Sequence, residues 1–530
     1  MTDAATADSA LGERGKIAGR AGIVAAGTLL SRVLGLVRDQ VIAAMFTRVA
    51  TDAFFIAFTL PNVLRQVLAE GAVQSAVLPV LASTREREGD AAARRFFASV
   101  RGLSLTLLTL TSIAGVLFAP QLVELFASGY RETPGQFERT VWLTRWVFPY
   151  IFFMGTAALG MAALNTHKRF VATSFAPGLL NLAFIACALL LPGWLATRGS
   201  APEFALALAV LVGGVLQVVA QWPSLLRIGY LGRPRLDLGD PGVREVLRRM
   251  LPVLAGMGVY YVDVVLARRF LSELGVGAQS YFSWALRLCD FPQGIFVMAL
   301  QTAALPSLAR LAAREDHAEF ATTFAFGMRL ALFIAIPATA LCVALAEPLV
   351  VLLFQRGEFD HVSAHETARA LIAQGSGIWL VAAVRQLVSA YYALGDTKTP
   401  ARVAAIDLGA FVLAALALRG PWGHVGVSAA VSVASAVQAA LLWIWLRPRL
   451  GRQVGAELFG SFAKTAFSAG FAAATVLGVL RVVHFTSPVT EALLGAPLFV
   501  VAFLAAARLV RSEELLSLLA LVQRKLRRAG

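Results

Sequence analysis

Charged side chains inside otherwise apolar segments are the residues of this 530-residue chain whose chemistry is most informative. Ser31, Arg32, Arg38 and Asp39 fall within one such segment. At about 100° per residue, Ser31 and Arg38 lie about 20° apart on one helix face, and Arg32 lies about 120° from Arg38. Ionisable groups in membrane spans are costly and usually face a cavity or a partner. These residues therefore predict a polar site between helices.

The other candidate site residues come from both halves of the chain. They are Asp52, Asn62, Arg65 and Glu70 in the second apolar segment, and Arg287, Asp290 and Arg385 farther along. One interpretation is that each arginine forms a buried ion pair, such as Arg38 with Asp39 or Arg287 with Asp290. The other is that the arginines outnumber nearby carboxylates and line a wet cleft that holds an anion. Guanidinium groups suit phosphate oxygens, so this second interpretation predicts a phosphate or diphosphate ligand.

A second set of residues predicts a cation site. Asp263 and Asp407 each lie in an apolar segment, and Ser432 lies in a later one. Two carboxylates with hydroxyl or carbonyl oxygens can bind a sodium ion. The alternative is that these are hydrogen-bonded polar residues at a lipid boundary. The sequence contains no P-loop, G-x-S-x-G or H-E-x-x-H motif, which argues against an ATP-driven pump or an enzyme. We therefore expect no cofactor, with a coupling sodium ion or the membrane potential as the driving force.

Long apolar helices must position these residues. The chain is 58% hydrophobic and 15% charged, whereas soluble proteins carry roughly 25% charged residues. Its apolar residues form segments of roughly 20 residues, the length that crosses a bilayer. We expect an all-α polytopic membrane protein with about 14 transmembrane helices. The predicted helices are 22–45, 53–84, 99–127, 141–165, 171–196, 203–226, 246–271, 277–311, 324–350, 364–394, 402–418, 424–446, 461–483 and 487–510.

The net charge of +15 is explained by membrane orientation. Basic residues are concentrated in alternate loops, for example at 85–95, 227–249 and 447–452, and at both ends of the chain. The positive-inside rule places these loops and both termini in the cytoplasm. No zinc-finger spacing or recognition-helix pattern accompanies the charge, so we expect no nucleic-acid partner.

Three short motifs recur at a spacing of about 230 residues. They are Ser75–Pro79 with Thr302–Pro306, Phe126–Gly129 with Phe354–Gly357, and Ala163–Lys168 with Ala393–Lys398. Because six predicted helices lie within one spacing, both copies share an orientation and form a parallel repeat. The predicted domains are a cytoplasmic tail at 1–21, a six-helix lobe at 22–226, a basic cytoplasmic linker at 227–245, a second six-helix lobe at 246–447, two further helices at 448–510 and a basic cytoplasmic tail at 511–530.

Several motifs of the chain resemble the MurJ/MviN family of lipid II flippases. The segments that carry the resemblance in the first two helices are Ser31–Asp39, Thr51–Phe58, Leu60–Arg65 and Ala69–Ala72. Further matches are Ala163–Asn165, Phe175–Pro177, Leu180–Asn181, Gly213–Gln217, Arg287 before Phe291–Pro292, and Asp396–Pro400. The resemblance covers nearly the whole chain, and the motifs of the first two helices are specific.

This resemblance implies the fold of the multidrug/oligosaccharidyl-lipid/polysaccharide exporter superfamily. Members of the MurJ/MviN family move lipid II, an undecaprenyl-diphosphate disaccharide-pentapeptide, from the inner to the outer leaflet of the bacterial cytoplasmic membrane. The resemblance implies that Arg32, Arg38, Arg65 and Arg287 are cavity arginines and that Asp52 and Glu70 are acidic site residues. It also implies that the last two helices form a groove for the lipid tail. Arg385 departs from the pattern, because some relatives carry lysine there.

The expected partners are therefore lipid II and membrane lipids, with the chain acting as a monomer near the cell-wall synthesis machinery. A flippase for another undecaprenyl-linked glycan would differ only in its headgroup pocket, which residue spacing does not resolve. A cation-coupled multidrug exporter would need fewer arginines and more carboxylates or aromatic residues in the cleft. A membrane glycosyltransferase would need a catalytic carboxylate or metal motif, and none is present in the sequence.

Overall fold

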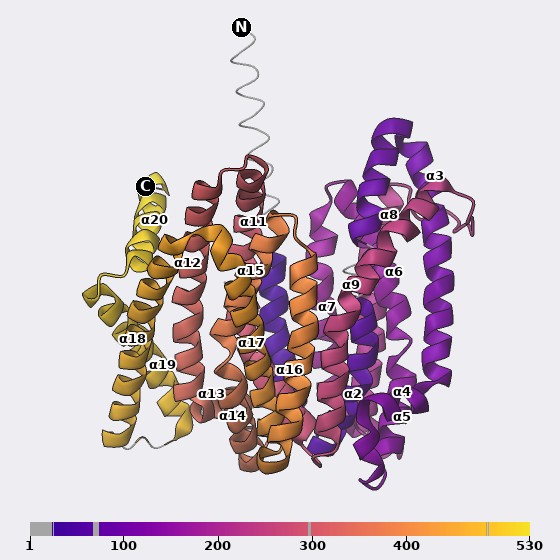
Figure 1. Cartoon of the computed structure of the whole chain (residues 1–530). Helices are drawn as coiled ribbons and strands as arrows, with labels where there is room; N and C mark the ends of the chain where they lie inside the picture. Colours follow the sequence, from indigo (N-terminus) through magenta and orange to yellow (C-terminus); the bar gives the residue numbers. More distant parts are fainter. Residues whose placement is uncertain are drawn as a thin grey trace. The chain divides into compact units, whose positions relative to one another are not determined.

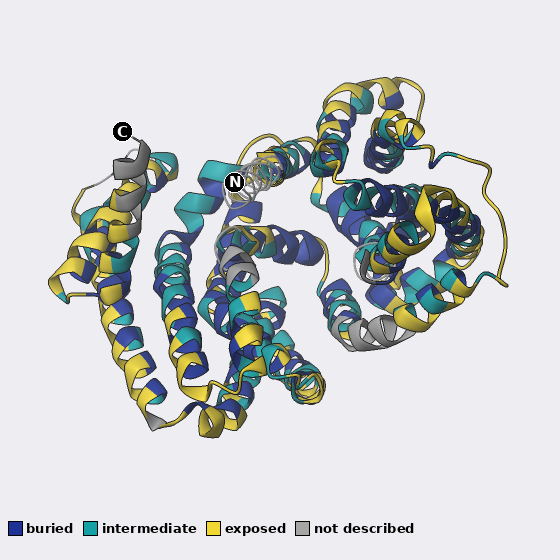
Figure 2. Ribbon diagram, turned by 90° about the horizontal axis from the view of Figure 1, so that it is seen from above, coloured by how far each residue is buried: buried dark blue, intermediate teal, exposed yellow. Residues whose placement is uncertain are grey.

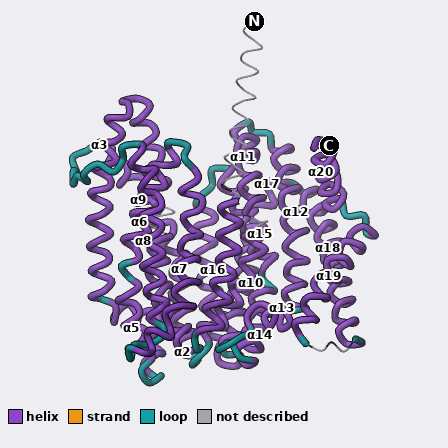
Figure 3. The backbone as a smooth tube through the Cα atoms, turned by 180° about the vertical axis from the view of Figure 1, so that it is seen from behind, coloured by secondary structure: helices purple, strands orange, loops and turns teal. Residues whose placement is uncertain are grey.

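The computed structural model describes residues 24, 26–66, 74–294, 298–483, 485 and 487–529. Throughout these residues the chain forms helices joined by turns, with no strand (Figure 3). The chain divides into two compact units, Met1–Tyr261 and Val262–Gly530. The division falls inside a helix, Pro241–Ser272, rather than in the loop at 227–245. The predicted domain limits stay a prediction, and each unit is described below by itself.

The first unit begins with helical residues 26–45 (Figure 1). Its further elements are α2 (Arg48–Arg65), α3 (Gln74–Leu117), α4 (Ala119–Ala127), the 3₁₀ turn η2 (Ser128–Arg131), α5 (Gln136–Val147), α6 (Tyr150–Thr166), α7 (Phe170–Thr197), α8 (Phe204–Arg227) and the first part of α9 (Pro241–Ser272). A non-helical Gly89, with φ 84°, divides α3 into two segments.

The second unit holds the rest of α9 and all later helices. They are α10 (Ala278–Pro292), α11 (Met298–Ala313), α12 (His317–Ala344), α13 (Ala346–Phe354), α14 (His361–Gly375), α15 (Ile378–Ala393), α16 (Lys398–Trp422), α17 (His424–Leu450), α18 (Arg452–Val482), α19 (Pro488–Leu509) and α20 (Glu513–Ala529). Buried side chains of α12, α15, α17, α18 and α19 form one continuous apolar core.

Ten stretches of the described chain are long and apolar enough to cross a membrane. They are Ala76–Leu117, Gln136–Thr166, Phe170–Thr197, Phe204–Arg227, His317–Ala344, His361–Ala393, Lys398–Trp422, His424–Leu450, Gln453–Val482 and Pro488–Leu509. Nine of them overlap one predicted span each, and Ala76–Leu117 overlaps both 53–84 and 99–127. The predicted all-α polytopic class is confirmed. Four predicted spans have no such stretch of their own among the described residues: 22–45, 53–84, 246–271 and 277–311. These spans carry the candidate site residues Arg38, Arg65, Asp263 and Arg287.

Several predicted single spans are each built from two helices. The span predicted at 99–127 breaks at Phe118, where φ is −90° and ψ is 14°, and the nine-residue α4 follows. The span predicted at 324–350 breaks at Leu345, where φ is −114° and ψ is 28°, and the nine-residue α13 follows. Likewise α5 and α6 are separated at residues 148–149, and α14 and α15 at residues 376–377. Hydropathy alone does not reveal such breaks, because the residues on both sides remain apolar.

The breaks also confirm the parallel repeat. Helices α3 to α6 of the first unit and α12 to α15 of the second unit follow the same order, with breaks at equivalent places. The recurring sequence motifs end equivalent helices: Phe126 and Phe354 close α4 and α13, and Ala163 and Ala393 lie near the ends of α6 and α15.

Small residues allow close helix packing within the first unit. A Cβ atom on Gly27 would lie 2.5 Å from the carbonyl oxygen of Ser174 in α7, and one on Gly213 in α8 would lie 3.0 Å from Cα of Leu180. Helices in a bilayer associate through such close contacts, because lipid offers no hydrophobic driving force. Many outward helix faces remain exposed and apolar, as Leu190 (74%) and Leu413 (71%) show, which suits a lipid surround (Figure 2).

Candidate functional site

Arg38 lies in a polar cluster between residues 26–45 and α7. Its Nε and Nη2 atoms donate to Oδ1 of Asp39 at 2.9 and 2.7 Å. Its Nη1 atom donates to Oδ1 of Asn181 at 2.9 Å, and its guanidinium carbon lies 5.5 Å from the ring centre of Phe184. The Arg38 and Asp39 side chains are only 13% and 7% exposed. The suggested Arg38–Asp39 ion pair is therefore present, and it fixes the direction of the guanidinium group.

Asn181 is a site residue that the sequence predictions missed. Its amide nitrogen donates to the carbonyl oxygen of Ser31 at 2.9 Å, while its amide oxygen accepts from Arg38. It thereby joins α7 to Ser31 and Arg38, two of the four predicted residues on the helix at 26–45. A lone asparagine in an otherwise apolar helix, Phe170–Thr197, was the available signal. Such a side chain needs a partner in a low-dielectric environment.

Asn62 and Arg65 form a second polar pair on α2. Arg65 Nε donates to Oδ1 of Asn62 at 3.0 Å, and both side chains are half-buried. The hydroxyl of Tyr261 donates to Oε1 of Gln66 at 3.1 Å and links the end of α2 to α9. The predicted site residue Glu70 lies outside the described residues.

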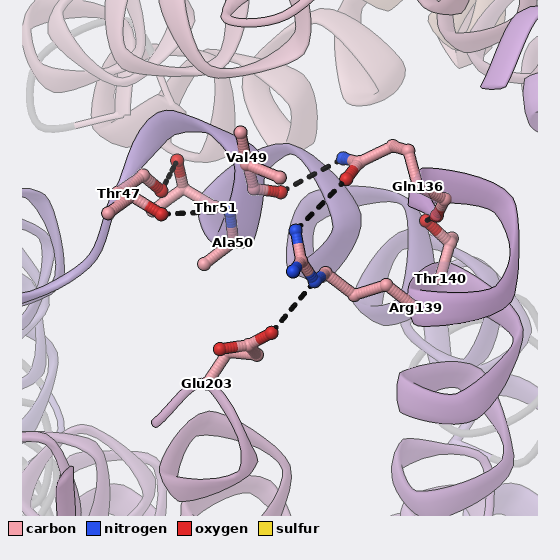
Figure 4. Close-up of polar contacts among 8 residues, drawn as sticks. All are labelled: Thr47, Val49, Ala50, Thr51, Gln136, Arg139, Thr140 and Glu203. Carbon is pink, nitrogen blue, oxygen red and sulfur yellow. Dashed lines mark hydrogen bonds and ion pairs between the residues drawn. The ribbon is translucent and has the colours of Figure 1, made fainter. Parts of the chain in front are cut away.

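Asp52 is fully buried near the start of α2. The turn before it is held by several contacts, which Figure 4 shows. Thr47 accepts from Ala50 N as the helix cap, and Gln136 donates to the Val49 carbonyl at 2.9 Å. Arg139 forms an ion pair with Glu203 at 2.9 Å (Figure 4). Side chains from α5 and the start of α8 thus fix the end of α2 that carries Asp52.

The remaining arginines divide between the units. Within the described residues, neither the Arg32 nor the Arg385 guanidinium has a hydrogen bond or ion pair, and both side chains are half-buried. Arg287 and Asp290 both lie on α10 and are exposed. The half-buried guanidinium groups of Arg32 and Arg385 therefore have no compensating carboxylate among the described residues. A meeting of the arginines of both units in one cleft stays a prediction.

Asp263 and Asp407 lie on neighbouring helices of the second unit. The rings of Phe270 and Phe411, farther along α9 and α16, are 6.5 Å apart, and Asp263 interacts electrostatically with Asp407. In each aspartate a buried Oδ1 atom has no hydrogen-bond partner among the residues that the structure describes. Two orphaned carboxylate oxygens fit a cation, whose ligands they would be. The Ser432 hydroxyl donates to the Ala373 carbonyl at 2.7 Å, which leaves its oxygen able to accept, and its place among the ligands stays a prediction.

A long apolar groove opens in the second unit between α12, α15, α17 and α18. Its volume is about 870 Å³, and Met328, Trp379, Ala440 and Phe462 are among the residues that line it. Arg447, near the end of α17, is the single charged residue on its wall. No described residue pairs with the Arg447 guanidinium. The groove can therefore hold an apolar chain, with an unpaired positive charge at one place on its wall.

The Asp396–Pro400 motif has a structural role. Asp396 accepts from the Thr399 backbone at 3.0 Å and from the Thr399 hydroxyl at 2.8 Å, and so it caps the start of α16. The Thr399 backbone N–H lowers the pKa of the Asp396 carboxyl group. Arg449 of α17 adds a contact at 3.4 Å.

Comparison with known proteins agrees with this architecture. Residues 41–496 match the family described as "Lipid II flippase MurJ". The lipid II flippase MurJ of Burkholderia cenocepacia is 35% identical over 432 residues, covering 80% of this chain and 82% of that protein. A solved structure of a lipid II flippase MurJ in an inward closed conformation superposes with a TM-score of 0.75 at 21% identity, covering 92% of this chain and 98% of the other. An inward-facing multidrug resistance MATE family transporter superposes with a TM-score of 0.65 at 16% identity, covering 81% and 95%.

Two parallel repeats of apolar helices, with polar spans at the start of each repeat, define a multi-pass membrane protein, and both solved structures share its fold. The family match and the similarity to the protein of Burkholderia cenocepacia narrow the assignment from a membrane protein to a single family. The chain belongs to the MurJ family of lipid II flippases.

Proposed function

We propose that this chain moves lipid II from the inner to the outer leaflet of the bacterial cytoplasmic membrane by alternating access. The observation that carries the proposal is the match of residues 41–496 to the lipid II flippase family. Asp39 neutralises the charge of Arg38, while Asp39 and Asn181 together hold its guanidinium group in one direction. A preorganised guanidinium group binds a phosphate with a smaller loss of side-chain freedom than a mobile one. Half-buried Arg32, which lies in the same unit as Arg38 and has no acidic partner among the described residues, adds positive charge for a diphosphate.

The groove of the second unit supports a role for the lipid tail. Its wall is made almost entirely of apolar side chains from α12, α15, α17 and α18. An isoprenoid chain placed there would avoid water while the sugar-peptide headgroup crosses through the polar region. Helix α18 is one of the two helices after the repeats that were predicted to form the tail groove. Helices α12, α15 and α17 also line this groove.

Sodium or the membrane potential would supply the driving force. Asp263 and Asp407 would hold the ion through their unpaired carboxylate oxygens, with backbone carbonyls completing its shell. A membrane potential acts on a net negative headgroup with about 2.3 kcal/mol per charge per 100 mV. The chain would act as a transporter without an enzymatic step.

The membrane orientation follows from the basic loops, which would place both termini in the cytoplasm. In this arrangement the groove residue Arg447 lies at the cytoplasmic end of α17, where lipid II is made available. We further propose that the chain works as a monomer near the enzymes of cell-wall synthesis, which use the lipid II that it delivers.

Depletion of the protein in its native bacterium, followed by a leaflet-resolved lipid II assay, tests the proposal. Complementation with Arg38→Ala or Arg287→Ala should leave lipid II in the inner leaflet. Arg87→Gln, at an exposed position of α3, is the control and should restore transport. Normal arrival of lipid II in the outer leaflet during depletion, in a strain without a second flippase, would reject the function.

A further inference from the structure

A small pocket opens in the first unit between α3, α6 and α8. Helix α6 packs against both of the other two helices (Figure 1). The pocket has a volume of about 120 Å³, and its wall is almost entirely apolar, with Phe97, Leu105 and Leu225 among the lining residues. None of the candidate site residues lines it, so the transport proposal leaves this pocket without an occupant.

Arg101 of α3 is the one charged residue among the described residues that line the pocket. Its Nη1 atom donates to the carbonyl oxygens of Tyr230 at 3.4 Å and Gly232 at 3.1 Å, in the segment between α8 and α9. No described carboxylate pairs with it. The two carbonyl groups hold one end of the guanidinium group, and its Nε and Nη2 atoms remain available to an anion. A charge next to apolar walls is stabilised by such a partner.

Gln221 of α8 supplies the pocket with a buried acceptor. The residue is 1% exposed, and its Nε2 atom donates to the Gln217 carbonyl at 3.2 Å. Its Oε1 atom has no hydrogen-bond partner in the part of the chain that the structure describes. Leaving a buried acceptor unpaired costs about 1–3 kcal/mol. Gly160, also on the pocket wall, leaves room for this oxygen, since a Cβ atom there would lie 2.7 Å from it. A donor brought by a ligand would satisfy the Gln221 oxygen.

The pocket lies near one end of the membrane spans. Arg101 is close to the start of the span predicted at 99–127, and Gln221 lies two turns before the end of α8 at Arg227. Trp222 lines the pocket and is 50% exposed, so the pocket reaches the outer surface of the unit. Tryptophan is enriched at the level of the lipid headgroups, and arginines near span ends reach headgroup phosphates. The expected ligand is therefore a membrane lipid.

We propose that this pocket binds an anionic phospholipid with a hydroxylated headgroup, such as phosphatidylglycerol. Its phosphate contacts Arg101, a headgroup hydroxyl donates to Gln221 Oε1, and its acyl chains run outside the pocket past Trp222. A cavity of roughly 150 Å³ holds a benzene ring, so the pocket has room for a headgroup and not for the chains. The proposed membrane orientation makes the leaflet the cytoplasmic one.

A hydroxyl donor is preferred to the ammonium group of phosphatidylethanolamine. No acidic residue is present among the described residues of the pocket wall. Burying an ammonium group without a carboxylate costs far more than burying a neutral hydroxyl that finds an acceptor. The pocket therefore distinguishes lipids by charge at Arg101 and by the hydroxyl group at Gln221.

The test uses the full chain in phosphatidylcholine nanodiscs that contain a small fraction of phosphatidylglycerol with a photoreactive diazirine near its headgroup. Crosslinked peptides are identified by mass spectrometry. We expect crosslinks concentrated on the α3 and α8 peptides that line the pocket, suppressed by unlabelled phosphatidylglycerol. Phosphatidylethanolamine, or phosphatidic acid, which is anionic but lacks the glycerol headgroup, should suppress them about five-fold less. Equal suppression by all three lipids, or crosslinks spread evenly over the lipid-facing helices, would overturn the proposal.

Two substitutions separate the charge from the acceptor. Arg101→Gln should lower the pocket crosslinks roughly tenfold, whereas Arg95→Gln, at an exposed position of the same helix, should not change them. Gln221→Leu keeps the side-chain volume and removes the acceptor, so phosphatidylglycerol and phosphatidic acid should then compete equally. Gln217→Leu, a buried amide one turn away that does not line the pocket, should keep the preference. An unchanged lipid preference in Gln221→Leu would reject the role of its oxygen.

A third variant fills the pocket without touching either polar group. Ser104→Trp, on the pocket wall, should abolish the pocket crosslinks, and Leu110→Trp, at a 58% exposed position of α3, should leave them unchanged. Full crosslinking in a folded Ser104→Trp chain would place the lipid elsewhere and reject the site. Because lipid binding is measured without lipid II, its failure rejects only this pocket and leaves the transport proposal to its own assay.

Discussion

Arg329 of α12 and Glu514 of α20 form a buried ion pair, with Nε 2.6 Å from Oε1 and side chains that are 17% and 3% exposed. Removing one partner of such a pair leaves an uncompensated charge, which costs about 3–5 kcal/mol. We expect Arg329→Met to lower the thermal unfolding midpoint of the detergent-solubilised chain by several degrees. Replacing both residues, in Arg329→Met/Glu514→Leu, should recover part of the loss. A double variant no more stable than Arg329→Met would contradict the pairing.

The same carboxylate makes stability depend on pH. Burial raises the pKa of Glu514, but hydrogen bonds from Ser512, from its own backbone, and from Arg329 and Ser461 outweigh burial and lower the pKa from 4.5 to about 2. Because the pKa is lower in the folded state, this contribution to stability is complete above pH 4.5 and is lost as pH falls toward 2. Thermal unfolding from pH 6 downward should therefore show a decline that Glu514→Gln reduces. Glu513→Gln, at a 68% exposed position, should retain the decline.

Asn181 should act on transport through Arg38. A hydrogen bond to a charged group contributes about 1.5–3 kcal/mol, so Asn181→Ala should weaken phosphate binding by roughly tenfold or more. Titration of the purified chain with a diphosphate lipid, followed by calorimetry, measures this change. Gln217→Met provides a control, since Gln217 is a buried amide in α8 whose Nε2 has no partner. Equal binding by Asn181→Ala and the parent chain would remove Asn181 from the site.

Filling the apolar groove should block the lipid tail without unfolding the chain. Ala436→Trp and Ala440→Trp place bulk on the wall that α17 contributes to the groove. We expect both variants to fold normally and to lose lipid II transport in the leaflet-resolved assay. Leu413→Trp, at a 71% exposed position on α16, adds similar bulk elsewhere and should transport normally. Full transport by both groove variants would show that the tail takes another route.

The two partnerless carboxylates should make transport depend on sodium. Asp263→Asn and Asp407→Asn each remove one charged ligand, and either should abolish a difference between flipping rates measured in sodium and in potassium vesicles. Ser432→Ala should change this difference less, because it removes at most a neutral hydroxyl ligand and no charge. Identical rates in both salts for the parent chain would leave the membrane potential as the driving force.

Hydropathy and internal repetition predicted most of the fold. The length of the apolar segments located the ten stretches that meet the requirements of a span. The recurring motifs showed that α4 and α13 are equivalent helices of the repeat, as are α6 and α15. The helix breaks at Phe118 and Leu345 were not predictable in this way, because a change of backbone direction between apolar residues leaves no trace in hydropathy. The single-span predictions at 99–127 and 324–350 therefore joined two helices each.

The sequence predicted which types of residue form the candidate site more reliably than it predicted which of them contact one another. The charges on the first helix indicated a polar cluster, and the Arg38–Asp39 pair was one of two open alternatives. Sequence spacing could not reveal that Asn181, 143 residues away, completes it, since only tertiary packing brings α7 alongside. Nor could it separate Ser432, which is bonded to the backbone, from the aspartates, whose oxygens have no partner.

The nine-residue helices α4 and α13 follow breaks of similar backbone conformation, at Phe118 and Leu345, in the two halves of the chain. Independent origin of the same interruption at the same place in each half is improbable. The ancestral gene that encoded a single half must already have specified it before that gene was duplicated and fused. Each copy then diverged in its charges, while the interrupted backbone was inherited by both.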